Sequence, residues 1–212
     1  MFKDRLDAAE RMATALAACA GQRPLLLAIP RGGVPIAALL AQRLGGDLDL
    51  VLVRKLHAPG APEFAIGAID ESGRTYLAPQ AGAFLASARY LARQKQLEQQ
   101  ELERRRHLYT PGRPRICAGG RLAVVVDDGL ATGATMVAAL QAVRRQQPAR
   151  LLCAVPVASP QGLKRVAPHA DEVVCLAAPR NFAAVSLFYG SFPQLRDDEV
   201  ISLLQTSTIR PA

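Results

Sequence analysis

Two adjacent carboxylates form the part of the sequence best suited to chemistry. Asp127 and Asp128 follow the apolar run at residues 122–126, which is typical of a buried strand. Neighbouring acids at the tip of a buried strand repel each other and lose hydration, so they persist where a cation or a hydrogen-bond donor needs them. We therefore expect this pair to accept hydrogen bonds from sugar hydroxyls or to hold a metal ion.

The segment after the acids has the composition of a phosphate cradle. It consists of small and hydroxyl residues that open a predicted helix: Gly129, Leu130, Ala131, Thr132, Gly133, Ala134 and Thr135. Small residues let backbone N–H groups converge on one point, and a helix begins with the positive end of its dipole. A phosphate cradle beside an acceptor for a diol describes a site for a phosphorylated ribose. Each feature taken alone also fits a plain strand–turn–helix connection. Neither G-x-x-x-x-G-K-[ST] nor G-x-G-x-x-G occurs in the chain.

Strands and helices alternate along most of the sequence. Strands are expected at residues 25–29, 48–53, 121–126, 150–157 and 172–176. Helices are expected at residues 2–20, 34–44, 134–147 and 161–167, with a short one starting near Asp197. This pattern predicts an α/β fold with a parallel sheet, Rossmann-like, flanked by helices. Ligands of such sheets bind at the carboxyl ends of the strands, which draws attention to the loops after residues 29, 53 and 126.

The middle of the chain has a different pattern. Residues 57–62 contain two prolines and a glycine and are predicted to form a loop, and residues 64–69 and 74–77 to form two strands around a turn. A long helix is expected at residues 83–108. We expect one domain over residues 1–212. Its tail at about 178–212 carries an aromatic cluster that could form a small hood, contact a partner subunit or close the core.

The stretch at residues 124–135 resembles the signature of type I phosphoribosyltransferases, which bind 5-phosphoribosyl-1-diphosphate (PRPP). That signature is four apolar residues, two acids, a few small residues and Thr-Gly-x-Thr. The resemblance implies the type I fold with a small hood. It implies that Asp127 and Asp128 contact the ribose 2′- and 3′-hydroxyls. It also implies that the loop from Ala131 to Thr135 binds the 5′-phosphate.

Two further loops match the family's pyrophosphate contacts. Arg31, Gly32 and Gly33 stand where the family has its pyrophosphate loop, although a plain tight turn is the alternative. Arg54 and Lys55 follow the second predicted strand, and the resemblance adds both to the catalytic residues Asp127 and Asp128. His57 is either a donor to the leaving group or a solvated loop residue.

The resemblance implies displacement of pyrophosphate from C1′ of PRPP by a nucleobase or amine, with Mg²⁺ as the cofactor. The metal would arrive through PRPP, with Asp127 and Asp128 as further possible ligands. Relatives that act on 6-oxopurines carry an acid at the position of Ala131, so that class of acceptor is not expected. The acceptor itself stays open, as in the stand-alone branch of the family.

Composition narrows the partners. The net charge of +8 suits anionic partners, whereas 5% aromatic residues and no Trp leave few platforms for nucleic-acid bases, so nucleic acid is not expected. No run approaches the roughly 18 apolar residues of a membrane span, and the first residues lack the pattern of a signal peptide. We expect a cytoplasmic homodimer that takes small molecules and contacts no membrane.

Two alternative functions stay open. The arginine run at residues 104–106 would suit a PRPP-responsive regulator that binds RNA, although a solvated helix end is the favoured explanation of the run. A hydrolase of phosphate esters would instead use Asp127 and Asp128 to hold a metal.

Overall fold

The computed structural model describes residues 1–77 and 87–206. It divides into two compact units, one formed by Met1–Val51 with Arg113–Ala212 and the other by Leu52–Gly112. We call them unit 1 and unit 2. The expectation of one domain over residues 1–212, with a hood at about 178–212, stays a prediction.

Unit 1 is built on a parallel sheet of five strands in the order β2-β1-β6-β7-β8. The strands are β1 (Leu25–Ala28), β2 (Asp47–Leu50), β6 (Leu122–Val126), β7 (Arg150–Val157) and β8 (Glu172–Ala177). The central strands β1 and β6 are buried along their whole length, as strands covered on both faces must be. The predicted α/β class and parallel sheet are confirmed.

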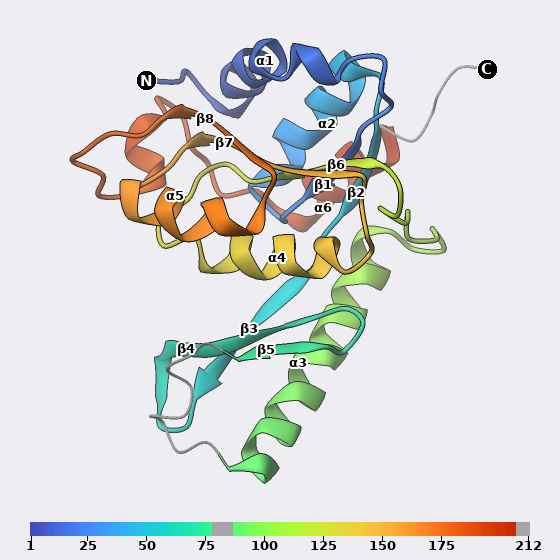
Figure 1. Cartoon of the computed structure of the whole chain (residues 1–212), viewed down its shortest axis with the longest axis vertical. Helices are drawn as coiled ribbons and strands as arrows, with labels where there is room; N and C mark the ends of the chain where they lie inside the picture. Colours follow the sequence, from blue (N-terminus) through green and yellow to red (C-terminus); the bar gives the residue numbers. More distant parts are fainter. Residues whose placement is uncertain (78–86, 207–212) are drawn as a thin grey trace. The chain divides into compact units, whose positions relative to one another are not determined.

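Helices cover both faces of this sheet (Figure 1), with α1 (Arg5–Ala15) and α2 (Gly33–Leu44) on one side and α4 (Ala134–Arg144) and α5 (Pro160–Val166) on the other. The last helix, α6 (Asp197–Thr206), packs against α2. Short 3₁₀ turns lie at Ala17–Cys19, Ala167–His169 and Val185–Phe188. The predicted helices of this unit are present, and several are shorter than the sequence pattern suggests.

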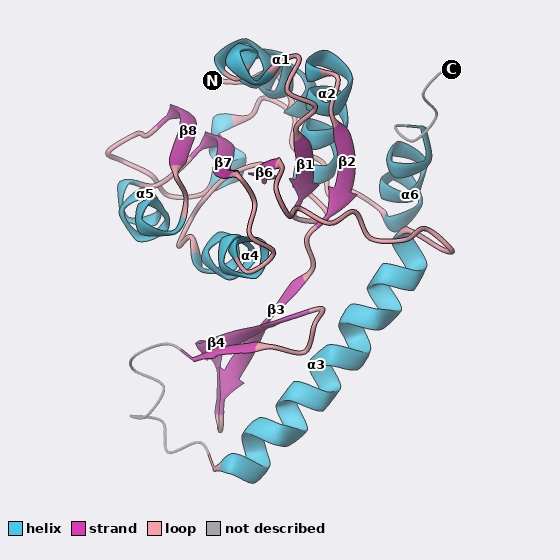
Figure 2. Ribbon diagram, turned by 45° about the vertical axis from the view of Figure 1, so that its right-hand side comes forward, coloured by secondary structure: helices cyan, strands magenta, loops and turns pink. Residues whose placement is uncertain are grey.

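Unit 2 is an antiparallel sheet of three strands in the order β3-β4-β5 with one long helix (Figure 2). Its elements are β3 (Val53–Ala58), β4 (Ala61–Asp70), β5 (Thr75–Leu77) and α3 (Ala88–Tyr109). Helix α3 contacts β3 and β4. The carboxylate of Asp70 accepts hydrogen bonds from Ser72 and from the N–H of Arg74, which closes the predicted turn between β4 and β5. The expected start of the long helix, before residue 87, lies outside the described residues.

Two predictions about residues 48–62 are wrong. The expected strand at 48–53 is two strands of different sheets, because the chain leaves the parallel sheet after Leu50 and begins β3 at Val53. The expected loop at 57–62 is a tight hairpin turn. Gly60 adopts a positive φ of 73°, which reverses the chain within two residues, so His57 belongs to β3 and pairs with Ala65.

The aromatic cluster of the C-terminal segment packs within unit 1. Tyr189 is buried against Phe2, with ring centroids 5.3 Å apart, and Phe182, Phe188 and Phe192 pack around them. Backbone hydrogen bonds join the two ends of the unit: Phe2 donates to Phe188, and Gly190 donates to Phe2. Of the three roles considered for this cluster, the structure shows core packing.

Candidate functional site

The acid pair stands at the carboxyl end of the central strand. Strand β6 ends at Val126, and the N–H of Asp127 still donates to Ala154 of β7 at 3.3 Å. The N–H of Asp128 then turns back and donates to Oδ1 of Asp127 at 2.9 Å. Both carboxylates therefore lie at the sheet edge where ligands of parallel sheets bind.

The surroundings oppose the charge on both acids. Burial raises the pKa of Asp127 well above its ordinary value, and the neighbouring charge of Asp128 raises it further. Burial also raises the pKa of Asp128, and Arg5 counteracts part of that rise. Two adjacent, partly buried acids of which only one contacts a cation are under-compensated, which is the arrangement expected where a ligand supplies the missing donors.

Arg5 is the cation, and it comes from the first turn of α1. Its Nε and Nη2 both donate to Oδ2 of Asp128, at 3.0 and 2.8 Å. Its Nη1 donates to the carbonyl of Pro193 at 2.9 Å, and its guanidinium lies 3.7 Å from the centre of the Phe192 ring. Arg5 is only 8% exposed.

The loop between β1 and α2 lies directly against the acids. A Cβ added to Gly32 would come within 2.0 Å of Oδ2 of Asp128, and one added to Gly33 within 2.4 Å of the Val126 carbonyl. Only glycine fits at either position. This close approach follows from the sheet order, since β1 and β6 are neighbours and their carboxyl ends lie side by side.

Arg31 precedes the two glycines in this loop. Its Nη1 lies 3.6 Å from Oδ1 of Asp197, at the start of α6, and its side chain is 36% exposed. The guanidinium is thus held loosely at the edge of the site.

Hydrogen bonds to the end of β7 and to the region of α5 hold the segment after the acids. The N–H of Leu130 donates to Val157 at 2.9 Å, and the carbonyls of Ala131 and Thr132 accept from Ser159 and Arg165. Because these carbonyls are engaged toward α5, the loop keeps a fixed shape. Gly133, with φ of 73°, is the N-cap of α4, so the first N–H groups of that helix have no partner within it. This is the geometry of an anion site.

A shallow hollow of about 260 Å³ joins several of these groups. Its lining combines the acid, the glycine loop and the C-terminal segment: Arg5, Arg31, Gly32, Asp128, Phe192, Pro193, Gln194 and Leu195. Of the predicted site residues, Arg31, Gly32 and Asp128 thus meet in one hollow of unit 1, whereas residues 129–135 are not among its lining.

The basic residues expected beside them belong to unit 2. Arg54 lies within β3, not in a loop after a buried strand, and donates to Glu98 of α3 at 2.7 Å. Lys55 is exposed, and Nδ1 of His57 is buried without a hydrogen-bond partner among the described residues. Their contact with PRPP stays a prediction.

Sequence reasoning missed Arg5 as part of this site, and it placed Tyr189 and Phe192 near the site only through the possible hood. A signal for Arg5 was present: residues 5, 8, 9 and 12 form the buried stripe of α1, and Arg5 is the one cation on it. A cation on the apolar face of a helix points to a buried acid elsewhere in the chain. Tyr189, whose hydroxyl donates to the backbone carbonyl of Asp128 at 2.7 Å, carried no comparable signal.

Comparison with known proteins decides the family. The model of the phosphoribosyl transferase domain matches residues 3–189. The chain belongs to the phosphoribosyl transferase family. The five-stranded parallel sheet of unit 1 agrees with that membership.

Relatives of this phosphoribosyl transferase chain include two Mycobacterium tuberculosis proteins, "Putative phosphoribosyl transferase MT0597" and "Putative phosphoribosyl transferase Rv0571c". Each is 44% identical over 207 residues, which is 96% of this chain and 46% of the relative. The chain thus spans about half the length of these relatives. The crystal structure of TT1426 from Thermus thermophilus is similar with a TM-score of 0.87 and 45% identity, covering 97% of this chain and 98% of that one.

The sequence also led to expectations about membrane contact, cellular location and oligomeric state. Within residues 1–77 and 87–206, no helix has the length and apolar character that crossing a membrane requires. The cytoplasmic location and the homodimer stay predictions.

Proposed function

We propose that this chain transfers the phosphoribosyl group of Mg-PRPP to a nitrogen nucleophile, a nucleobase or an amine, with release of pyrophosphate. One observation carries the proposal: the order of elements in the site matches the order of groups on the donor. Pyrophosphate is attached to C1′, the diol follows at C2′ and C3′, and the phosphate is at C5′. Gly32 lies against Asp128, and the chain runs from the acid pair directly into residues 131–135 at the start of α4, so the three groups connect in the same order.

The acids suit the diol because each keeps one oxygen for it. Oδ1 of Asp127 accepts from the Asp128 N–H, and Oδ2 of Asp128 accepts from Arg5. The other oxygen of each carboxylate then accepts from one ribose hydroxyl. Such hydrogen bonds to charged acceptors are stronger than those between neutral groups.

The leaving group is stabilised from the side of β1. In the reaction the bond from C1′ to the pyrophosphate oxygen breaks, its electron pair leaves with pyrophosphate, and a bond from C1′ to the acceptor nitrogen forms. The guanidinium of Arg31 and the N–H of Gly32 are proposed to meet the negative charge that grows on pyrophosphate, whereas the N–H groups of Gly33 and Val34 already donate to Ile29 and Arg31. From unit 2, Arg54, Lys55 and His57 are proposed as further contacts.

Magnesium fits the site as a metal shared with the donor. Among the described residues, no group of three or more His, Cys, Asp or Glu side chains is placed to hold a metal ion alone. Mg²⁺ is commonly bound by one or two carboxylates together with substrate phosphates, and Asp127 and Asp128 could supply that share. When bound, the ion would neutralise charge developing on pyrophosphate.

The test is binding followed by turnover. Calorimetry with Mg-PRPP should give saturable binding, and a panel of nucleobases and amines should include an acceptor that releases pyrophosphate. Binding without turnover for every acceptor would contradict a transferase. Absence of PRPP binding together with phosphatase activity would favour a hydrolase.

The structure weakens the RNA-binding alternative. Arg104 and Arg105 both donate to Glu101, and Arg106 donates to Glu71. The Arg106 guanidinium is therefore committed to a largely buried carboxylate, whereas Arg104 and Arg105 stay partly exposed, so the run presents two cations, not three, to the phosphates of a nucleic acid.

A further inference from the structure

Arg5 is the buried group of the site that the proposed reaction does not use. Its three guanidinium nitrogens donate to Asp128 and to the Pro193 carbonyl, and the Phe192 ring covers one face of it. A planar guanidinium held at every nitrogen and stacked on a ring has little freedom to rotate. Arg5 therefore presents a fixed fork to the carboxylate.

The fork determines which oxygen of Asp128 remains free. Nε and Nη2 converge on Oδ2, at 3.0 and 2.8 Å, so rotating the carboxylate would break both bonds. Gly32 lies against the whole carboxylate and nearest to Oδ2: a Cβ added to it would lie 2.0 Å from Oδ2 and 2.8 Å from Oδ1, so a ligand cannot reach Oδ2 from the side of the β1–α2 loop. Only Oδ1 is left to accept from a ribose hydroxyl.

The C-terminal segment holds the fork in place. The Tyr189 ring packs against the Phe192 ring, with centroids 4.8 Å apart, and the Tyr189 hydroxyl donates to the Asp128 carbonyl. The backbone of Gly190 and Ser191 is in turn bonded to Phe2 and Lys3, just before Arg5. Arg5, Asp128 and the segment around Phe192 thus form one connected group of contacts.

We propose that Arg5 is a positioning residue that selects the oxygen of Asp128 available to the donor and so makes the site selective for ribose over a deoxyribose. This proposal rests on the proposed function, because it assumes that the acids bind the ribose hydroxyls. It assigns Arg5 no contact with the ligand itself.

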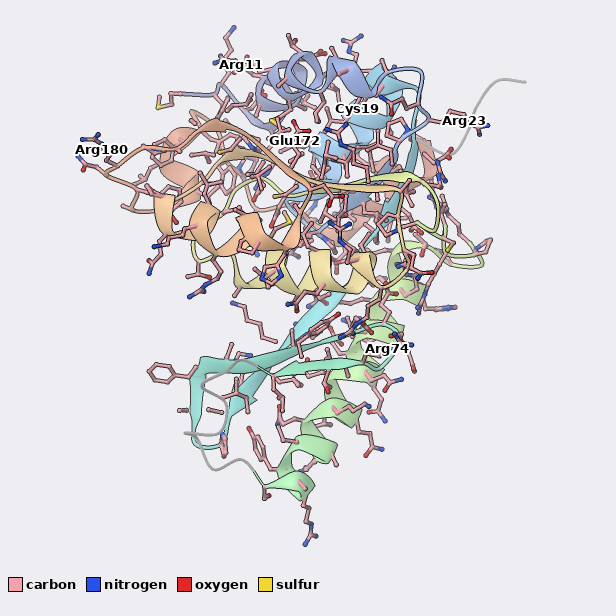
Figure 3. The ribbon with its side chains drawn as sticks, viewed as in Figure 1. Arg11, Cys19, Arg23, Arg74, Glu172 and Arg180 are labelled. Carbon is pink, nitrogen blue, oxygen red and sulfur yellow. The ribbon has the colours of Figure 1, made fainter. Side chains whose placement is uncertain are left out.

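The experiment compares Arg5→Gln with a matched control. Arg11 lies on the same helix, pairs with Asp7 at 2.8 Å and lies 5.3 Å from the Phe2 ring, but its side chain is half exposed. Figure 3 labels it on α1, at the outer surface of unit 1. Arg11→Gln should leave every affinity unchanged.

The readout is calorimetric affinity for three probes: ribose 5-phosphate, 2-deoxyribose 5-phosphate and 3-deoxyribose 5-phosphate. The unaltered chain should prefer ribose 5-phosphate over each deoxy sugar by about tenfold or more, since each hydrogen bond to a charged acceptor is lost. Arg5→Gln should reduce the preference to about twofold against one deoxy sugar, the one lacking the hydroxyl bound by Asp128, and keep it against the other. Arg5→Lys should restore part of the lost preference.

Unchanged preferences in Arg5→Gln would overturn the proposal. Equal loss for all three probes would also overturn it, because that outcome indicates a purely structural role. If Arg5→Gln does not fold, Phe192→Leu and Arg5→Lys take its place in the comparison. Phe192→Leu removes the ring that covers Arg5, and Arg5→Lys keeps a cation beside Asp128, so each loosens the fork without removing the charge. Failure of the unaltered chain to bind PRPP would instead contradict the proposed function, whatever Arg5 does.

Discussion

The two units treat their carboxylates in opposite ways. In unit 2, Glu71, Glu98 and Glu101 each accept a hydrogen bond of 2.7 Å from an arginine. In unit 1, Asp127 and Asp128 are adjacent and partly buried, and among the described residues Arg5 is their one cationic partner in contact. Glu71 and Glu98 join separate segments of unit 2 and Glu101 pairs within α3, whereas the acids of unit 1 leave acceptor capacity unused.

The pKa values of Glu101 in unit 2 and Asp127 in unit 1 shift in opposite directions, because arginines contact the first acid and not the second. The guanidinium groups of Arg104 and Arg105 lower the pKa of Glu101 to about 2. Burial and the charge of Asp128 raise the pKa of Asp127. A carboxylate that its own fold disfavours is a better candidate for ligand binding than one that the fold has already neutralised.

Replacing both site acids should give the largest effect. Asp127→Asn with Asp128→Asn should weaken Mg-PRPP binding by more than about 100-fold, because two hydrogen bonds to charged acceptors are lost. Circular dichroism should show that the fold survives. Retained affinity would mean that the ribose site is elsewhere.

The single variants sharpen the comparison. Asp127→Asn should not lower the free energy of unfolding at pH 7, since burial disfavours its charged form. Asp128→Asn should lower it, because Arg5 then remains buried beside a neutral group. Urea unfolding of both variants measures the difference, and equal behaviour would contradict it.

Gly32→Ala should weaken PRPP binding by about tenfold to 100-fold, since its Cβ would displace the Asp128 carboxylate. The control is Gly112→Ala in unit 2. Gly112 has φ of 68° and open space around it, so alanine there should cost about 1 kcal/mol of stability and leave PRPP affinity unchanged. If Gly112→Ala lost PRPP affinity and Gly32→Ala did not, the β1–α2 loop would not be part of the PRPP site.

Glu71→Gln should lower the free energy of unfolding by about 2–3 kcal/mol, because it neutralises a carboxylate to which the largely buried Arg106 guanidinium donates at 2.7 Å. The loss should appear in urea unfolding, and PRPP affinity should be unaffected. If Glu71→Gln weakened Mg-PRPP binding as much as the double variant of Asp127 and Asp128, the acids of the two units could not be distinguished by function.

Glu101→Gln should have the smallest effect, about 0.5 kcal/mol, since its partner arginines are partly exposed and solvent screens the pairs. Because the pKa of Glu101 is lowered from 4.5 to about 2, its contribution is complete above the ordinary value and is lost as the pH falls toward about 2. Thermal unfolding of both chains should therefore converge as the pH falls from 5 to 3. A constant gap would exclude an ionic origin.

Sequence predicts these features unequally. The strand β6 and the segment 127–135 each lie in one continuous stretch of sequence, so their apolar run, acids and small residues could be recognised without knowledge of the fold. The Arg5–Asp128 pair joins residues 123 positions apart, and no local pattern names the partner. The run at 48–53 failed because an unbroken series of apolar and acidic residues does not show where a chain changes sheets. Pro59 and Gly60 indicated a break in regular structure at 57–62, but the tight turn between β3 and β4 depends on strand pairing across it, which the local sequence does not show.

The path of the chain through unit 2 has a consequence for how proteins of this family diversify. Residues 52–112 form an insertion in unit 1 whose two ends are held by neighbouring strands: Val51, which follows β2, donates to Ala28 of β1, and on return Arg113 donates to Leu48 and Ile116 to Asp49 of β2. Both junctions are thus fixed by contacts within unit 1. We therefore expect the insertion to be exchangeable between homologues by recombination at these two sites, without disturbing the loops that carry Gly32 and Asp127.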